Sequence, residues 1–458
     1  MASVHAPASH ATRALAEWVA SPHSLPELTT TMAKRCVLDW LGAGYAGCDT
    51  PAGRIATRLA AALGGPEEST LLGGRRAGCT AAAMANGITS HAVEMDDLHR
   101  PSVMHLGTVT IPAALALGER EHCTGRRLLE AIACGYEVGA RVAEACGVAH
   151  YRFWHVTGTA GTFAAAGAGA VILGLSPQQT RDALGSAGTM AAGLWEFLAD
   201  GTMSKTLHAG RAAETGVLSA LLARDGFTGS GTILEGEKGI LRAMAGGGTP
   251  ARLTDGLGEG YRIDENSFKL HAACGHIHPA IDAALELRRR GLRTDEIARV
   301  HVRTFRVAIE VTGIPNPQNP YQAKFSLPFC VALALARGRV GLGEFTTDTL
   351  ADPALRALAD RVTYAEDGGR TAAYPDRWGA IVEVQGKRGD RHEVRVDTPR
   401  GSPDNPATDE ELLDKFTALS ASRLSAERRA RVAEAIGAID QASDVTAISW
   451  GSDADDRR

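Results

Sequence analysis

Aromatic residues are scarce and basic charge is not in excess in this sequence of 458 residues. Phe, Trp and Tyr make up only 5% of the chain, whereas alanine and glycine are abundant. Small side chains suit close-packed helices better than a large sheet, so the composition predicts a mostly helical protein. The formal net charge of −5 argues against nucleic acid or an anionic membrane surface as the main partner.

The eight cysteines lack the spacing of a disulfide framework or a zinc motif, because no CxxC pair occurs. Several lie in apolar helical contexts, which is typical of reduced, buried thiols. The N-terminus lacks the apolar core of a signal peptide, and no apolar run approaches the roughly 18 residues that a membrane span needs. We therefore expect a soluble, cytoplasmic protein that does not enter a membrane.

The length predicts two or three domains. Helical periodicity dominates both ends of the chain, whereas segments that alternate with a period of two fall within 295–398, and ARVHVRTFRVAIEV reads as a strand. We predict a large all-helical domain made from residues 1–265 and 400–458, with a smaller α+β lid domain over 266–399 inserted between them. The predicted fold class is mainly α with α+β.

Residues 86–112, NGITSHAVEMDDLHRPSVMHLGTVTIP, place acids and imidazoles between two apolar segments that read as buried helices. The acids are Glu94, Asp96 and Asp97, and His105 follows them. Acids and imidazoles held side by side can tune one another's pKa, which allows acid–base chemistry near neutral pH. We expect one wall of an active site here. The alternative is a helix cap formed by Asp96 or Asp97, followed by a solvated polar loop.

His155 precedes a long run of small residues within 150–176, which predicts a tightly packed core helix with a polar N-terminal end. The alternative is that Thr157 or Thr159 simply caps this helix. No strand precedes the glycines of the run, so we exclude a dinucleotide fingerprint.

Lys205 and His208 lie just before, or on the first turns of, another apolar helix in the segment GTMSKTLHAGRAAETG. Cationic groups at a helix start are typical of a carboxylate pocket. A plain solvated surface is the alternative.

A further segment, NSFKLHAACGHIHPAIDAALEL, sets Lys269 and three histidines ahead of a helix. Three histidines within 271–278 could suggest a metal. No acidic or cysteine partner stands at a recognisable ligand spacing, and HxxxxHxH is not a standard zinc pattern. We therefore predict that no metal is bound there.

Six segments together resemble the MmgE/PrpD family in their order and approximate spacing. They are NGITSHAVEMDDLH, RFWHVTGTAGTFAAAGAGAVILGLS, MSKTLHAGRAAETG, SFKLHAACGHIHPAIDA, QAKFSLPFCVALAL and GSPDNPATDEELLDKF. That family includes 2-methylcitrate dehydratase, cis-aconitate decarboxylase and iminodisuccinate epimerase. The resemblance spans nearly the whole chain and implies a homodimer, no metal or organic cofactor, and a catalytic cleft between the two domains.

The resemblance also implies a set of site residues, carried over position by position. The expected catalytic residues are His105, His155, Asp96, Lys205 and Lys269. The expected substrate contacts are Glu94, Asp97 and His208, with Tyr321 and Lys324 as looser matches. This chain departs from the common DFDDT form of the family at Glu94 and Leu98, and its EMDDLH form looks closer to the branch that holds the epimerase.

Dehydration, decarboxylation and epimerisation of a small polycarboxylate all require charge to be stabilised on a carbon next to a carboxyl group. Lys205 and Lys269 would pair with substrate carboxylates. His105 and His155 would be the acid and base, and Asp96 would orient a histidine. We predict a cofactor-independent lyase, of dehydratase or decarboxylase type, that acts on a di- or tricarboxylate. The alternatives are an epimerase of a dicarboxylate such as iminodisuccinate, and a non-catalytic helical scaffold.

Overall fold

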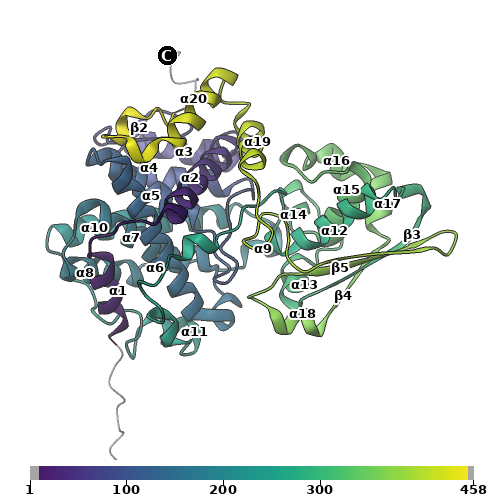
Figure 1. Ribbon diagram of the computed structural model, residues 1–458, viewed down its shortest axis with the longest axis horizontal. Helices are drawn as coiled ribbons and strands as arrows, with labels where there is room; N and C mark the ends of the chain where they lie inside the picture. Colours follow the sequence, from purple (N-terminus) through teal and green to yellow (C-terminus); the bar gives the residue numbers. More distant parts are fainter. Residues whose placement is uncertain (1–9, 452–458) are drawn as a thin grey trace, which may run out of the picture. The chain divides into compact units, whose positions relative to one another are not determined.

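The structure is a computed structural model that describes residues 10–451. The chain divides into two compact units (Figure 1). Unit 1 comprises Met1–Phe197, Met203–Asn266 and Asp409–Arg458, and unit 2 comprises Leu198–Thr202 and Ser267–Thr408. The division differs from the one expected from the sequence at three places, because residues 198–202 and 400–408 belong to unit 2 and Asn266 belongs to unit 1.

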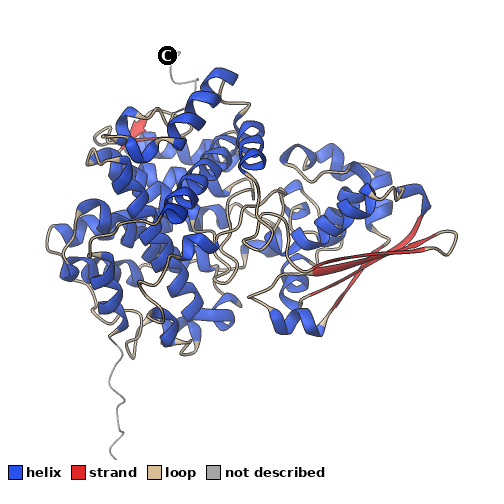
Figure 2. Cartoon of the chain, viewed as in Figure 1, coloured by secondary structure: helices blue, strands red, loops and turns tan. Residues whose placement is uncertain are grey.

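Unit 1 is built almost entirely from helices (Figure 2). These are α1 (Ala11–Val19), α2 (Glu27–Cys48), α3 (Pro51–Leu63), α4 (Cys79–His91), α5 (Gly107–Arg120), α6 (Gly125–Tyr151), α7 (Val156–Leu173), α8 (Pro177–Thr189), α10 (Ser204–Arg224), α11 (Ile240–Ala245), α19 (Asp409–Ser420) and α20 (Ala426–Gly437). A two-stranded antiparallel ribbon, β1 (Ser69–Thr70) with β2 (Arg76–Ala77), qualifies the expectation of an all-helical domain.

Helix α7 forms the centre of unit 1 and contacts α5, α6, α8 and α10. All its residues up to Ile172 are buried. Its alanines and glycines let neighbouring backbones approach closely. A side chain at Gly216 of α10, for example, would place its Cβ 2.2 Å from the Cβ of Ala165, so only glycine fits there. The predicted core helix is confirmed.

By length and composition alone, α7 would also suit a membrane span, and it is the one helix among the described residues of which this is true. This finding corrects the expectation that no apolar run approaches that length. Because 94% of the helix is buried inside the protein, its apolar surface is already covered by the helices around it.

Unit 2 contains a four-stranded sheet with the strand order β4-β3-β5-β6. Strand β3 (Ile297–Thr304) pairs in parallel with β4 (Val362–Glu366) and antiparallel with β5 (Ala380–Gly386), and β5 pairs antiparallel with β6 (Arg391–Val396). One face of this sheet buries valines, and α12 (His278–Arg289) packs against β5 and β6. The fold class, mainly α with α+β, is confirmed.

The remaining helices of unit 2 surround this sheet or continue from it. They are α13 (Arg306–Thr312), α14 (Pro320–Ala323), α15 (Leu327–Arg337), α16 (Thr347–Ala351), α17 (Pro353–Ala359) and α18 (Gly368–Ala373), and α9 (Phe197–Asp200) begins at the boundary between the units. The predicted strand over ARVHVRTFRVAIEV is wrong in its second half, which forms α13. Ala308 and Thr312 are buried one helical turn apart, so packing overrides the β propensity of this segment.

Candidate active site

The loop between α4 and α5, residues 92–106, carries the acids and imidazoles that the sequence singled out. Every residue of this loop except Pro101 is buried. Buried charges are costly unless they are paired or hydrogen-bonded, so this loop is an organised polar cluster inside unit 1. The alternative of a solvated loop is wrong.

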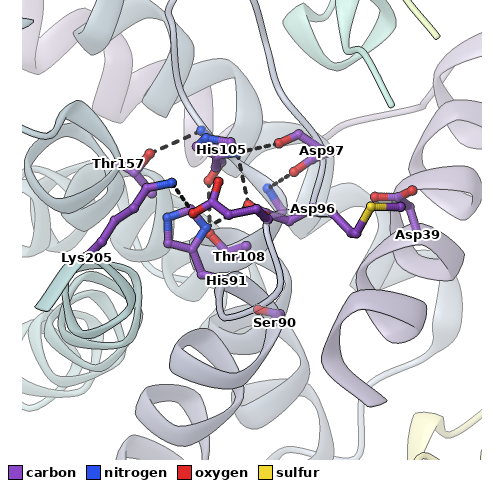
Figure 3. Close-up of polar contacts among 12 residues, drawn as sticks. Asp39, Ser90, His91, Asp96, Asp97, His105, Thr108, Thr157 and Lys205 are labelled. Carbon is purple, nitrogen blue, oxygen red and sulfur yellow. Dashed lines mark hydrogen bonds and ion pairs between the residues drawn. The ribbon is translucent and has the colours of Figure 1, made fainter. Parts of the chain in front are cut away.

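Asp96 lies between two imidazole rings (Figure 3). Its Oδ2 is 2.8 Å from Nδ1 of His91 and 2.9 Å from Nδ1 of His105. Nδ1 of His105 is also 2.7 Å from the main-chain carbonyl of Asp97. Carboxylate and carbonyl oxygens only accept hydrogen bonds, so both Nδ1 atoms carry protons. Nε2 of a neutral His105 is therefore the nitrogen that can accept a proton.

The carboxyl group of Asp97 accepts hydrogen bonds from other parts of the protein. Its Oδ2 accepts hydrogen bonds from the Tyr136 hydroxyl at 2.6 Å and the Asn266 amide at 2.7 Å, and its Oδ1 accepts one from the main-chain N–H of Gly107 at 3.0 Å. Burial raises the pKa of Asp97 to about 7, although the hydrogen bonds from Tyr136 and Asn266 oppose this shift. The side chain fastens the loop to α5 and α6, and its expected contact with substrate stays a prediction.

Lys205, in the first turn of α10, forms a buried ion pair with Glu94. Both side chains are at most 3% exposed, so the alternative of a solvated surface is wrong for this lysine. Glu94 has a φ of 60°, a left-handed conformation that non-glycine residues rarely adopt. Such conformations cost on the order of 1–3 kcal/mol and persist where the surroundings fix them, often at functional sites.

His155 and His208 form a second imidazole contact. Their Nδ1 atoms are 3.2 Å apart, so one ring donates and the other accepts. His155 is the N-cap residue of α7, while Thr157 and Thr159 lie within the helix, so the alternative that either threonine caps it is wrong.

Ring contacts join these two groups into one imidazole row, His208–His155–His91–His105. The centroids of His208 and His155 are 5.3 Å apart, and those of His91 and His105 are 4.8 Å apart. His91 stacks on His155 at 5.6 Å with an interplanar angle of 15°. The structure therefore brings both predicted catalytic histidines into contact with the same intermediate ring.

Burial, and then the positive charge of Lys205, hold the pKa of His155 well below its usual range. Burial also lowers the pKa of His208 to about 4. Both rings are therefore neutral near pH 7, and a neutral imidazole can accept a proton. Of the two roles that the sequence left open for His155, this environment favours the base.

Aromatic side chains pack against the row at His155 and His208. The ring of Trp195 meets that of His155 edge-on at 5.2 Å, and Phe197 lies 5.8 Å from His208. These apolar neighbours withhold water from the imidazoles, and this desolvation is the largest cause of their lowered pKa values.

The sequence analysis did not single out His91, one of the two inner rings of the row. It lies in the last turn of α4, where twelve of the thirteen residues are buried. Its Nε2 is buried without a hydrogen-bond partner among residues 10–451, and such atoms in native proteins often mark functional sites. The available signal was a histidine at the end of an apolar helix, five residues before Asp96.

Lys269, Tyr321 and Lys324 belong to unit 2. Lys269 and Lys324 are buried and Tyr321 is half-buried. Lys324 lies 5.7 Å from the ring of Phe345, and Tyr321 packs against Phe325 at 5.4 Å. Their role in binding substrate stays a prediction.

The histidines of the 271–278 segment have different polar partners, although the rings of His271 and His278 also meet edge-on at 5.1 Å. His271 contacts Asp282 at 2.7 Å, His276 stacks on Trp378 at 4.4 Å, and His278 contacts the Ala273 carbonyl at 3.2 Å. Within the described chain they do not form a group of ligands.

Among the described residues, the group that could hold a metal is His91, Asp96 and His105, whose ligand atoms lie within 4.8 Å of one another. The same atoms fit a hydrogen-bonded network, because the Nδ1 proton of His105 also serves the Asp97 carbonyl at 2.7 Å. A metal on that nitrogen would remove this buried carbonyl's donor. The donor set therefore fits proton transfer better than metal binding.

Together, paired histidines, a carboxylate behind one of them and a buried lysine give the helical unit a site that is capable of acid–base chemistry. The chain belongs to the MmgE/PrpD family. The model of the MmgE/PrpD N-terminal domain matches residues 13–253, and that of the C-terminal domain matches residues 271–441.

The similar proteins include lyases, and two of them match most of this chain. The cis-aconitate decarboxylase-like protein oryM of Aspergillus oryzae is 29% identical over 96% of this chain and 97% of its own length. Human cis-aconitate decarboxylase is 29% identical over 86% of this chain and 84% of its own. The mitochondrial 2-methylcitrate dehydratase of Yarrowia lipolytica is 29% identical over 50% of this chain and 46% of its own. These names agree with the prediction that the chain is an enzyme of the lyase class.

Proposed function

We propose that this protein is a cofactor-independent lyase that acts on a small di- or tricarboxylate by acid–base chemistry next to a carboxyl group. The observation that carries this proposal is the imidazole row beside Lys205, with Asp96 behind His105. The reactions named for the relatives, decarboxylation and dehydration, both need proton transfer at such a carbon.

In a dehydration, a base takes the proton from the carbon next to the carboxylate while an acid protonates the departing hydroxyl, which leaves as water. Neutral His155 is suited to the first task. His105 is suited to the second, because the carboxylate of Asp96 at 2.9 Å stabilises the imidazolium form that carries the proton on Nε2.

In a decarboxylation, the carbon–carbon bond breaks, carbon dioxide leaves, and the electron pair left on carbon takes up a proton. The imidazolium form of His105 would supply that proton. Lys205 would stabilise the negative charge that develops on the neighbouring carboxylate, and a preorganised contact of this kind contributes about 3–4 kcal/mol.

Lys205 is already paired with Glu94, so a substrate carboxylate would join an existing ion pair. We propose that Glu94 keeps the ammonium group oriented and lowers the cost of leaving it buried. Lys269, Tyr321 and Lys324 are proposed as further substrate contacts from the family resemblance, and Lys269→Met should raise the Michaelis constant.

Epimerisation is the second candidate, because His155 and His105 both offer a nitrogen that can accept a proton, at separate points of the row. An epimerase needs two bases on opposite faces of one carbon. The acidic loop also has Glu94 where the family usually has aspartate, and this form of the loop resembles the branch of the family that holds the epimerase.

One experiment separates these reactions. The purified protein is incubated in deuterated water with cis-aconitate, 2-methylcitrate or iminodisuccinate, and the mixtures are followed by NMR and mass spectrometry. A lyase yields a product that has lost carbon dioxide or water. An epimerase washes deuterium into its substrate without other change of mass. A protein that binds none of these compounds and changes none would be the non-catalytic scaffold.

We also propose a homodimer in the cytoplasm. The dimer follows from the family resemblance, and the eight cysteines, none of which forms a disulfide, fit a reducing compartment. Light scattering after gel filtration should give twice the chain mass of 48.0 kDa, and a value equal to one chain would contradict the dimer.

A further inference from the structure

A second buried lysine contacts the acidic loop from the far end of the chain. Lys415 lies on α19, and its Nζ is 2.5 Å from the main-chain carbonyl of Met95 and 2.6 Å from Oδ1 of Asp39 on α2. The Lys415 side chain is 5% exposed and that of Asp39 is fully buried. Lys415 and Met95 are 320 positions apart in the sequence.

Met95 lies between two residues of the candidate site. Glu94, before it, pairs with Lys205, and Asp96, after it, faces the Nδ1–H groups of His91 and His105. The peptide that follows Met95 therefore leads directly to the carboxylate behind His105. The hydrogen bond from Lys415 to the Met95 carbonyl therefore fixes the position of this peptide.

The backbone at this point needs such support. Glu94 has its φ at 60°, and a strained residue returns to an ordinary conformation unless its neighbours hold it. Lys205 holds the side chain of Glu94, and Lys415 holds the carbonyl of the next residue. The two lysines fasten consecutive residues of the loop from α10 and from α19.

The charge of Lys415 has a second effect in the same place. Asp39 and Asp96 both act on Asp97, whose pKa is raised first by burial and then by these negative charges. Because Lys415 balances Asp39, three neighbouring carboxyl groups share the interior with less mutual repulsion.

We propose that Lys415 is a positioning residue for the reaction, which places Asp96 between His91 and His105 by holding the Met95 carbonyl. This inference rests on the proposed function for its catalytic consequence. The geometric part stands on the contacts of Lys415 alone.

The chain offers a matched control. Lys34 on α2 makes the same kind of contact to the C-terminal segment, with one carboxylate oxygen of Asp440 at 2.6 Å and the Gly437 carbonyl at 2.8 Å. Its partners lie outside the acidic loop. Lys34→Met therefore removes a lysine that joins the two ends of unit 1 without touching the site.

The test compares Lys415→Met, Lys415→Arg and Lys34→Met by amide hydrogen exchange and steady-state kinetics. We expect Lys415→Met to speed exchange in residues 93–105 at least tenfold and to lower kcat by about 10–100-fold, the size that a misplacement of about 1 Å produces. KM should change little, because Lys205 still binds. Lys415→Arg should restore part of the protection, and Lys34→Met should leave both loop exchange and kcat unchanged.

Loss of the buried cation could unfold the protein, since it removes the positive charge beside the buried carboxylate of Asp39. The double variant Lys415→Met, Asp39→Asn also removes the negative charge of Asp39. It still lacks the hydrogen bond to the Met95 carbonyl, so the loop should still exchange fast in a folded protein. Unchanged exchange in residues 93–105 in the folded double variant, or an equal effect in Lys34→Met, would overturn the proposal. The exchange measurement needs no substrate, so failure of the proposed reaction would leave this result intact.

Discussion

The Nδ1 atoms of His155 and His208 lie 3.2 Å apart although the residues are 53 positions apart in the chain. One proton fits between them, and burial keeps the pKa of both rings low. Both rings are therefore neutral near pH 7, and this buried contact makes His155 the first target for mutation.

His155→Gln should lower turnover by roughly a hundredfold or more with the fold intact, the usual size of a lost general base. A melting curve and a single-turnover assay measure the two effects. His150→Gln is the control, because His150 is also buried but contacts Thr159 and Met244, outside the row. Lost stability with unchanged specific activity in His155→Gln would show that His155 is only a packed core residue.

Lys205→Met should destabilise the protein by about 3–5 kcal/mol, because it leaves the buried carboxylate of Glu94 without its cation. The double variant Lys205→Met, Glu94→Gln should recover most of that stability and still bind substrate weakly, with a raised KM. Chemical denaturation and steady-state kinetics separate these effects. A double variant with normal KM would remove Lys205 from the binding role.

Asp96→Asn should lower kcat about a hundredfold or more. Both Nδ1–H groups meet the same oxygen of Asp96, so asparagine presents to both rings either a neutral, weaker acceptor or its NH₂ group, which favours the wrong tautomer. Nitrogen NMR of the imidazoles should show this change directly. Asp264→Asn, at a carboxyl group bound by Thr29 away from the row, is the control. Normal tautomers with full activity in Asp96→Asn would contradict the assigned role.

Acid should destabilise the protein between about pH 6.5 and 4. Burial lowers the pKa of His150 and of His208 to about 4, whereas the unfolded chain binds protons near pH 6.5. The unfolded state therefore holds more protons in this range, and the free energy of unfolding falls as the pH falls. His150→Gln should make the slope shallower by up to about 1.4 kcal/mol per pH unit. An equal change in the exposed His10→Gln would contradict this assignment.

Local sequence patterns predicted those parts of the structure that local interactions decide. The long run of small residues predicted α7, and the short distance between Asp96 and His105 in the sequence predicted their contact. Packing decided the second half of ARVHVRTFRVAIEV, which continues to Thr312 as a helix and buries Ala308 and Thr312. A period-two pattern could not predict that outcome.

The rest of the site is assembled from positions that carry no local signal. Asn266 and Lys415 are an ordinary amide and an ordinary surface-type cation in the sequence, and only the fold brings them to Asp97 and Met95. His91 was hidden for a different reason. Its partner Asp96 is near in sequence, but the turn after α4 decides that the two side chains meet.

The fastening of Met95 by Lys415 has a consequence for the order in which the protein becomes active during synthesis. A nascent chain emerges N-terminus first and begins to fold as it does so. It exposes the acidic loop, α5, α6 and α7 long before α19 leaves the ribosome. Until then Met95 and Asp39 lack their cation, so the newborn protein would complete its proton-transfer machinery among the last steps of its own translation.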